Sequence, residues 1–169
     1  MKTVKSSPAP RSRKAASVPP TSPFSQGYRM PAEWEPHAAT WLAWPHEPSD
    51  WPGKFDAVPW VFAEVIKNLT LGERVRLLVS GKRMQKEASQ KLEKSQVDLR
   101  LVDFVEAPTD RSWTRDFLPL FVVKAGRAGK RPLGAVKFSF NGWARYDNFQ
   151  RDEAAGLRVQ ARATTRGVT

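Results

Sequence analysis

Short apolar runs alternate with amphipathic stretches through the middle of the 169-residue chain, and this alternation constrains its fold most strongly. Thr40–Trp44 is an apolar run bounded by prolines and predicts a buried strand, and Arg74–Ser80 predicts a second strand. Between them, apolar residues at helical spacing predict a helix over 57–69, with Asp56 as its N-cap.

The same alternation continues towards the C-terminus. Ser80 is expected to cap a helix with a narrow apolar stripe, and Val97–Phe104 predicts the next strand. Two further apolar runs, joined by a polar turn that contains glycine, predict an antiparallel pair: Phe117–Val123, the turn Lys124–Pro132 and Ala135–Phe140. This order of elements predicts an α/β or α+β domain.

The formal net charge of +11 is concentrated at the two ends of the chain. Residues 1–26 carry five bases and no acid, in a Ser- and Pro-rich stretch that predicts a disordered basic leader or an organelle transit peptide. Residues 154–169 carry three arginines and no acid, and we expect an irregular tail there, produced by a truncation or a shifted reading frame. The body over 27–153 is nearly balanced in charge.

Several classes of function lack support in the sequence. The absence of cysteine excludes disulfides, thiolate metal sites and cysteine nucleophiles within this chain. The two histidines, His37 and His46, are nine residues apart and have no further ligand at a standard metal spacing, so no metal or cofactor is expected. There is no glycine-rich phosphate loop and no Gly-x-Ser-x-Gly motif. With no apolar run of about 20 residues, we expect no membrane span and a cytoplasmic location.

Two groups of residues suggest a ligand site. Five of the seven tryptophans lie between Trp34 and Trp60, which indicates either a packed aromatic corner or an aromatic pocket for a flat or cationic ligand. The segment Asp110–Asp116 is either a solvated turn with internal ion pairs or a site for a planar cation. In the second case, Asp116 accepts two parallel N–H bonds from a guanidinium and Trp113 offers a flat face.

Three segments together resemble a known family. They are Gly27–His37 with Thr40–His46, then Asp110–Pro119, then Phe140–Trp143 continuing to Asp147 and Asp152–Glu153. Their sequences are similar to motifs of agmatine deiminases and the related bacterial-type peptidylarginine deiminases, in the same order. The resemblance covers 27–153, which is the N-terminal part of that family's catalytic domain.

The resemblance implies a fold and a substrate. The family has the pentein fold, a propeller of ββαβ modules, of which this chain would hold an incomplete part. By resemblance, Asp116 would bind the guanidinium of a small guanidino substrate and Trp113 would form the wall beside it. The peptidylarginine branch binds a substrate carboxylate with arginines just after the residue matching Asn141. Here Gly142, Trp143 and Ala144 follow, with Arg145 alone nearby, which favours agmatine.

The departure from the family lies in the catalytic groups. The resemblance implies a cysteine nucleophile, a histidine in a His-x-Asp motif and a glutamate in a Glu-Gly-Gly segment, and the chain contains none of these motifs. We therefore assign no catalytic residue and expect a fragment of a hydrolase that converts agmatine to N-carbamoylputrescine and ammonia, inactive alone. The alternatives are a fragment of the peptidylarginine deiminase type, a basic nucleic-acid-binding module that uses its tails, and a partner that docks on a full-length homologue. The sequence leaves the oligomeric state open.

Overall fold

A computed structural model describes residues 22–126 and 132–165. In chain order its helices and strands are β1 (Ala39–Ala43), α1 (Val58–Leu69), β2 (Arg74–Val79), α2 (Lys82–Lys94), β3 (Val102–Glu106), α3 (Thr114–Phe117), β4 (Leu120–Val123), β5 (Leu133–Val136) and α4 (Gln150–Thr165). Short 3-10 turns add η1 (Pro48–Asp50), η2 (Phe55–Ala57), η3 (Leu99–Leu101) and η5 (Gly142–Ala144). Most of the expected leader, and residues 127–131 of the expected turn, lie outside the described residues.

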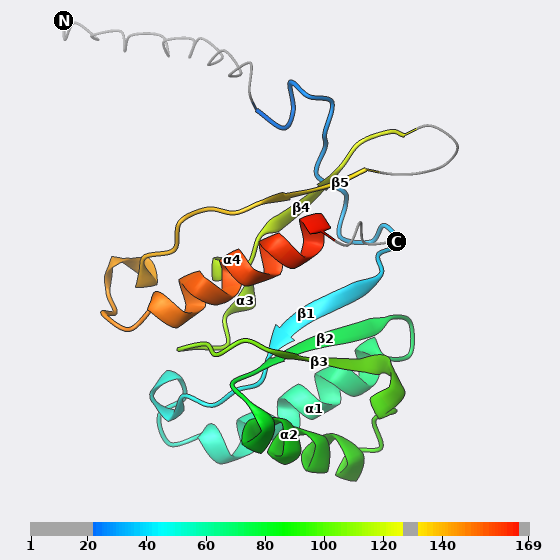
Figure 1. Cartoon of the computed structure of the whole chain (residues 1–169). Coiled ribbons are helices and arrows are strands. Elements are labelled where there is room, and N and C mark those ends of the chain that lie inside the picture. Colours follow the sequence, from blue (N-terminus) through cyan, green and yellow to red (C-terminus); the bar gives the residue numbers. More distant parts are fainter. Residues whose placement is uncertain (1–21, 127–131, 166–169) are drawn as a thin grey trace, which may run out of the picture.

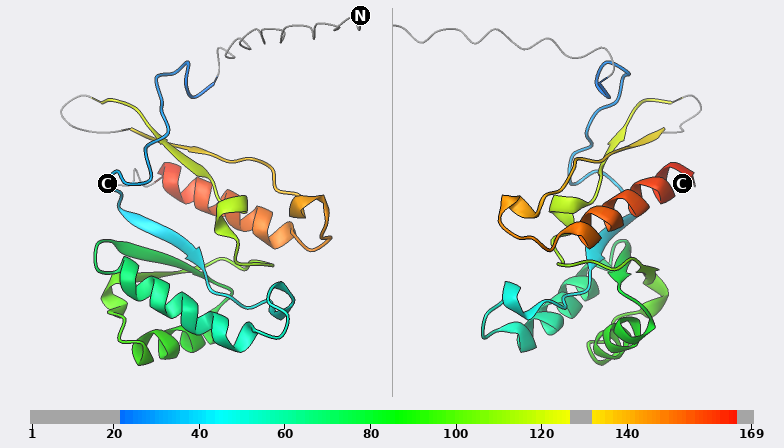
Figure 2. Two further views of the ribbon diagram at one scale, coloured as in Figure 1. Left: turned by 180° about the vertical axis from the view of Figure 1, so that it is seen from behind. Right: turned by 60° about the vertical axis from the view of Figure 1, so that its left-hand side comes forward.

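The first half of the molecule is a parallel sheet with strand order β1-β2-β3. Parallel neighbours need crossover connections, and these are almost always right-handed, so sequential strands carry their helices on one face. Figures 1 and 2 show α1 and α2 together on that face. The expected mixed α/β architecture is confirmed in this form, and the described residues contain no closed propeller.

The central strand β2 explains how two cores form on one sheet. Side chains alternate across a strand, so Val75, Leu77 and Val79 point towards α1 and α2, while Leu78 points to the other face. The first face forms an entirely apolar core with Ile66 of α1 and residues of α2.

The second half lies on the opposite face of the parallel sheet. It contains the expected antiparallel pair β4–β5, in which Leu120 pairs with Val136 and Val123 with Leu133. The second strand differs from the expected Ala135–Phe140, because pairing with β4 covers only Leu133–Val136. Helix α4 lies between this hairpin and the parallel sheet (Figure 1). Its buried Ala155 and Val159 join Leu78 in a second apolar core.

The two expected N-caps are wrong. Asp56 lies within η2, and the N-cap position of α1 is Ala57, without a side-chain hydrogen bond. Helix α2 begins after Gly81, whose φ of 148° favours glycine, and the side chain of Ser80 does not cap it. In each case one extra residue of turn separates the polar side chain from the helix.

Two expected strands begin later than the sequence indicates. The stretch expected as a strand from Val97 starts with the 3-10 turn η3, and only Val102–Glu106 pairs with β2. The stretch expected from Phe117 starts with the end of α3, because Phe117 is fully buried as the last residue of that helical turn.

The prediction of an irregular tail after Glu153 is also wrong. Residues 150–165 form α4, the longest helix described, and its buried face consists mainly of small or β-branched side chains at helical spacing: Ala155, Val159 and Ala163. Alanines interspersed with three arginines give a weak apolar pattern in the sequence. They still form a buried face, because the helix packs closely on the sheet. None of the helices in the described residues is long and apolar enough to cross a membrane.

Candidate guanidinium site

The segment Asp110–Asp116 follows β3 and ends in the single helical turn α3. Phe117 has no exposed surface and anchors this turn in the second core. Because side chains around one helical turn diverge, the same turn leaves Asp116 exposed to solvent. A buried aromatic anchor therefore presents an exposed carboxylate.

Helix α4 holds the start of this segment through a reciprocal exchange of hydrogen bonds. Oδ1 of Asp152 accepts from the backbone N–H groups of Asp110 at 2.8 Å and Arg111 at 3.1 Å. In return, Oδ2 of Asp110 accepts from the backbone N–H of Arg151 at 2.8 Å. Carboxylates bound to free backbone N–H groups fix a loop firmly, so the loop and the helix start are one unit.

The first motif also reaches this segment. The two ring nitrogens of His46 lie 2.9 Å from the carbonyl oxygens of Trp44 and Thr109. The hydroxyl of Thr114 donates to the carbonyl of Trp41 at 3.3 Å. All three segments that carry the family resemblance therefore meet around residues 109–116.

The indole of Trp113 packs against a second tryptophan. Its ring is stacked on that of Trp51, with centroids 5.7 Å apart and an angle of 26°, and its Nε1–H donates to Oδ2 of Asp50 at 3.1 Å. The side chain keeps 44% of its surface exposed. Trp51 therefore covers one face of the Trp113 ring and Asp50 fixes its orientation, and the rest of the side chain is open to solvent.

A buried ion pair supports that indole. The guanidinium of Arg111 binds Oδ1 of Asp50, and both side chains are 5% exposed. Arg111 also donates to the side-chain oxygen of Asn148 at 3.1 Å and lies 4.0 Å from the ring centre of Tyr146. These contacts hold Arg111 inside the protein as a structural residue, with its Nε buried and without a hydrogen-bond partner.

Asp116 has a different neighbour. Its Oδ1 accepts a hydrogen bond from the indole Nε1–H of Trp143 at 3.3 Å. Trp143 is 40% exposed and packs edge-on against Phe140, with ring centroids 4.9 Å apart. As ligand-binding residues, Asp116 and Trp113 remain predictions; the structure assigns each of them a fixed aromatic neighbour.

Burial of the Asp152 side chain, which is fully excluded from solvent, raises its pKa to about 6. The hydrogen bonds from the backbone of Arg111 and Asp110 oppose this rise, and the nearby charge of Asp110 adds to it. Its second oxygen, Oδ2, is buried without a hydrogen-bond partner. Because Asp152 is fully buried, its role is to hold the loop at Asp110 and Arg111 in place, and it is not accessible to a ligand.

The tryptophan-rich stretch does not form one cluster. Trp44 is buried in the first core, Trp60 lies under the ammonium of Lys91 at 4.4 Å, and Trp34 is 87% exposed. Two members of the stretch contact the Asp110–Asp116 segment: the ring of Trp51 stacks on Trp113, and the backbone carbonyl of Trp41 accepts from Thr114. The stretch therefore forms neither a single packed aromatic corner nor a single aromatic pocket, because tryptophans close in sequence lie in different parts of the fold.

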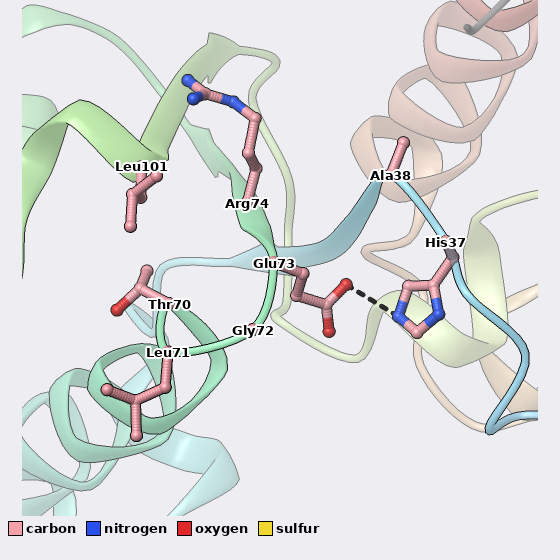
Figure 3. A pocket seen from close by; sticks show the side chains of 8 residues that line it. All are labelled: His37, Ala38, Thr70, Leu71, Gly72, Glu73, Arg74 and Leu101. Atoms are coloured by element: carbon pink, nitrogen blue, oxygen red, sulfur yellow. Dashed lines mark ion pairs between the residues drawn. The ribbon is translucent and has the colours of Figure 1, made fainter.

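His37 belongs to a separate hollow of about 430 Å³ beside the turn that joins α1 to β2 (Figure 3). Its Nε2 pairs with Oε2 of Glu73 at 2.7 Å. The backbone carbonyl of Glu35, and further the charge of Glu73, raise the pKa of this histidine against the opposing effect of burial. Neither Asp116 nor Trp113 lines this hollow. Among residues 22–126 and 132–165, no three side chains of His, Cys, Asp or Glu gather as a metal site.

Asp50 and Trp143 are the site residues that the sequence did not single out by role. In the sequence Trp143 stands out only because it occupies a stretch in which the peptidylarginine branch carries arginines, and nothing in the sequence marks Asp50. Their hydrogen bonds span 63 and 27 residues along the chain, so local spacing holds no trace of them. The only sequence signal for these contacts is an aromatic residue near an acid, and this combination is too common to predict a hydrogen bond.

Comparison with known proteins gives consistent matches over most of the chain. An agmatine deiminase of Ectopseudomonas mendocina is 31% identical over 144 residues, which is 82% of this chain and 36% of that protein. An X-ray structure assigned as an agmatine deiminase superposes with a TM-score of 0.70 at 27% identity, covering 88% of this chain and 40% of the other. The agmatine deiminase of Enterococcus faecalis shares the fold, with a TM-score of 0.69 at 23% identity and coverage of 91% and 40%.

This chain thus spans well under half the length of these relatives. The family model for Porphyromonas-type peptidyl-arginine deiminases matches residues 29–168, which includes α4 and runs past Glu153. A change of reading frame at Glu153 has no support in this match. The chain belongs to the Porphyromonas-type peptidyl-arginine deiminase family.

Proposed function

We propose that this chain provides the guanidinium-binding part of an agmatine deiminase-type hydrolase, and that alone it binds agmatine without converting it. The whole reaction would yield N-carbamoylputrescine and ammonia. The observation that carries the proposal is the meeting of three motif segments around residues 109–116, which leaves Asp116 and Trp113 accessible on a rigid support.

The chemistry of these two side chains suits a guanidinium. A carboxylate accepts two parallel N–H bonds from its planar fork, and an exposed indole face attracts a delocalised cation. Trp113 keeps that face because Trp51 and the Arg111–Asp50 pair hold it from the other side. We infer that the described α/β arrangement is an incomplete part of a pentein-type propeller, whose remaining modules would enclose the site.

Turnover needs groups that this chain lacks. Attack on the guanidinium carbon requires a strong nucleophile such as a thiolate, and the sequence contains no cysteine. Asp116 is an acceptor for the substrate, and Asp152 is sealed from it. The proposed chain is therefore a binding unit.

Calorimetric titration of the purified chain with agmatine tests the binding proposal. We expect saturable binding that Asp116→Asn abolishes, because the variant loses the paired anionic acceptor. Glu93→Gln removes an exposed carboxylate of α2, on the far face of the sheet, and serves as the matched control with unchanged affinity. Equal affinity in the Asp116 variant and the control would overturn the proposal.

Two further arms define the ligand and the activity. L-arginine carries a carboxylate that agmatine lacks, so tighter binding of agmatine supports the agmatine type and tighter binding of arginine supports the peptidylarginine type. An assay for released ammonia is expected to stay at background. Ammonia release from the purified chain, lost in Asp116→Asn, would contradict the assignment as a binding unit alone.

A further inference from the structure

The turn η5 has an unusual backbone. Gly142, Trp143 and Ala144 all have positive φ, at 63°, 58° and 54°. Glycine adopts this left-handed region freely, whereas residues with a Cβ enter it at a cost and mostly singly. Two such residues in succession after a glycine indicate a backbone held in place by its surroundings, which is typical of functional segments.

Specific contacts hold this turn. The side-chain oxygen of Asn141 accepts from the backbone N–H of Ala144 at 3.2 Å and closes it. A Cβ placed on Gly142 would lie 3.3 Å from the Cβ of Phe149, so the turn sits tightly against that residue. The turn is therefore fixed at both ends, by a hydrogen bond and by close packing.

The result of this geometry is the position of one indole. Trp143 stands edge-on to the buried Phe140, at 89° with centroids 4.9 Å apart, and its Nε1–H points to Oδ1 of Asp116 at 3.3 Å. Phe140 in turn contacts Phe117, the residue next to Asp116, with centroids 6.2 Å apart. The indole and the carboxylate are thus anchored in the same core.

We propose that Trp143 is a positioning residue for the guanidinium site, one that orients the carboxylate of Asp116 for a two-point hydrogen bond with the ligand. This inference rests on the proposed function. A carboxylate has about four lone-pair positions on two oxygens. The indole N–H takes one of them, and both oxygens keep acceptor capacity for the two parallel N–H groups of a guanidinium.

The indole acts by limiting rotation. An exposed carboxylate turns freely about its terminal torsion, and a ligand that needs one plane must stop that rotation on binding. Trp143 fixes the plane beforehand, because its own ring is held by Phe140 and its backbone by Asn141. A ligand with a single N–H donor would gain less from this arrangement than a guanidinium.

Trp143→Phe tests the role of the hydrogen bond, since phenylalanine keeps the ring on Phe140 and removes the N–H. We expect agmatine affinity to fall about five- to tenfold, because the ligand must then stop the rotation of the released carboxylate itself. The melting temperature is expected to stay close to that of the unaltered chain. Trp60→Phe is the matched control, because that half-exposed indole contacts Lys91 on α2, and its affinity is expected to stay unchanged.

The outcomes separate the two proposals. Binding that is lost in Asp116→Asn and unaltered or tighter in Trp143→Phe would overturn the positioning role alone. No agmatine binding by the unaltered chain would overturn the proposed function and the positioning role of Trp143 with it. A fall in affinity equal to that of Trp60→Phe would likewise overturn the role of Trp143.

A second measurement does not depend on ligand binding. In a proton–nitrogen correlation spectrum, the indole resonance of Trp143 is the one missing from Trp143→Phe. Asp116→Ala removes the acceptor at an exposed position, and we expect this resonance to move to lower proton frequency and to exchange faster with water. An unchanged resonance would show that no hydrogen bond joins the two side chains and would overturn the proposal.

Discussion

The two faces of the parallel sheet are built by different means. On one face, α1 and α2 cover β1–β3 with a core of apolar side chains alone. On the other face, α4 and the β4–β5 hairpin combine a smaller apolar core with buried charges, among them Arg111, Asp50 and Asp152. Every residue of β4 and β5 is only half-buried.

The first face therefore stabilises the fold, whereas the second face orients the residues of the candidate site. Apolar packing is strong and has no direction, whereas hydrogen bonds and ion pairs fix orientation at little net gain in stability. The candidate guanidinium residues Asp116 and Trp113 lie next to Phe117 of the second core, where orientation matters. Trp51 links Trp113 to Phe62 of α1. We therefore expect the largest loss of stability from removing apolar side chains on the first face. On the second face we expect stability to respond to steric clashes and to the titration of buried charges.

Leu77→Ala is expected to have the largest effect. Leu77 is fully buried in the central strand, so the variant loses apolar burial and leaves a cavity, at a cost of about 4 kcal/mol. Val122→Ala, in the half-buried β4, is expected to cost about 1 kcal/mol or less. Urea unfolding followed by circular dichroism measures both, and equal losses would remove the proposed difference between the faces.

Gly156→Ala is expected to destabilise the chain, although this exchange inside a helix normally stabilises it by about 1 kcal/mol. A Cβ at Gly156 would lie 2.2 Å from the carbonyl oxygen of Phe117 and 2.3 Å from Cε of Lys137, so α4 would have to move away from α3. We expect a loss of about 3 kcal/mol.

Gly72→Ala is the control for this variant, because a Cβ there meets no atom within 4 Å. Its expected effect is within about 0.5 kcal/mol. If Gly156→Ala melts at or above the temperature of the control, the close approach of α4 to α3 is wrong.

The pH dependence of stability tests the buried carboxylate. Because burial raises the pKa of Asp152 from 3.8 to about 6 on folding, the folded chain holds more protons than the unfolded chain between these values. Stability contributed by the protonated group is therefore complete below about pH 4 and falls as the pH rises through 6.

Asp152→Asn removes this titration and keeps an oxygen for the backbone N–H groups of Asp110 and Arg111. Between pH 4.5 and 7, the free energy of unfolding of the unaltered chain should fall by about 2 kcal/mol more than that of the variant. Urea titrations at both pH values measure the difference, and parallel profiles would refute the raised pKa.

Much of the fold followed from local patterns. Strands β1 and β2 and helices α1 and α2 lie where the apolar spacing predicts them, because each buries one continuous face. Helix α4 was missed, since Ala155 and Ala163 contribute too little apolar surface to mark a face in sequence. Their burial depends on a neighbour close enough for a small side chain to fill the gap.

The candidate site divides in the same way. The sequence singled out Asp116 and Trp113 because an acid and an indole in one short charged segment suit a planar cation, and it excluded a cysteine mechanism within the chain outright. It could not show that Trp113 rests on Trp51 and Asp50, or that Asp116 faces Trp143. Residue types and their local spacing determine which chemistry is available, whereas contacts between segments 27 to 63 residues apart depend on how the sheet and helices pack, and only the tertiary structure decides them.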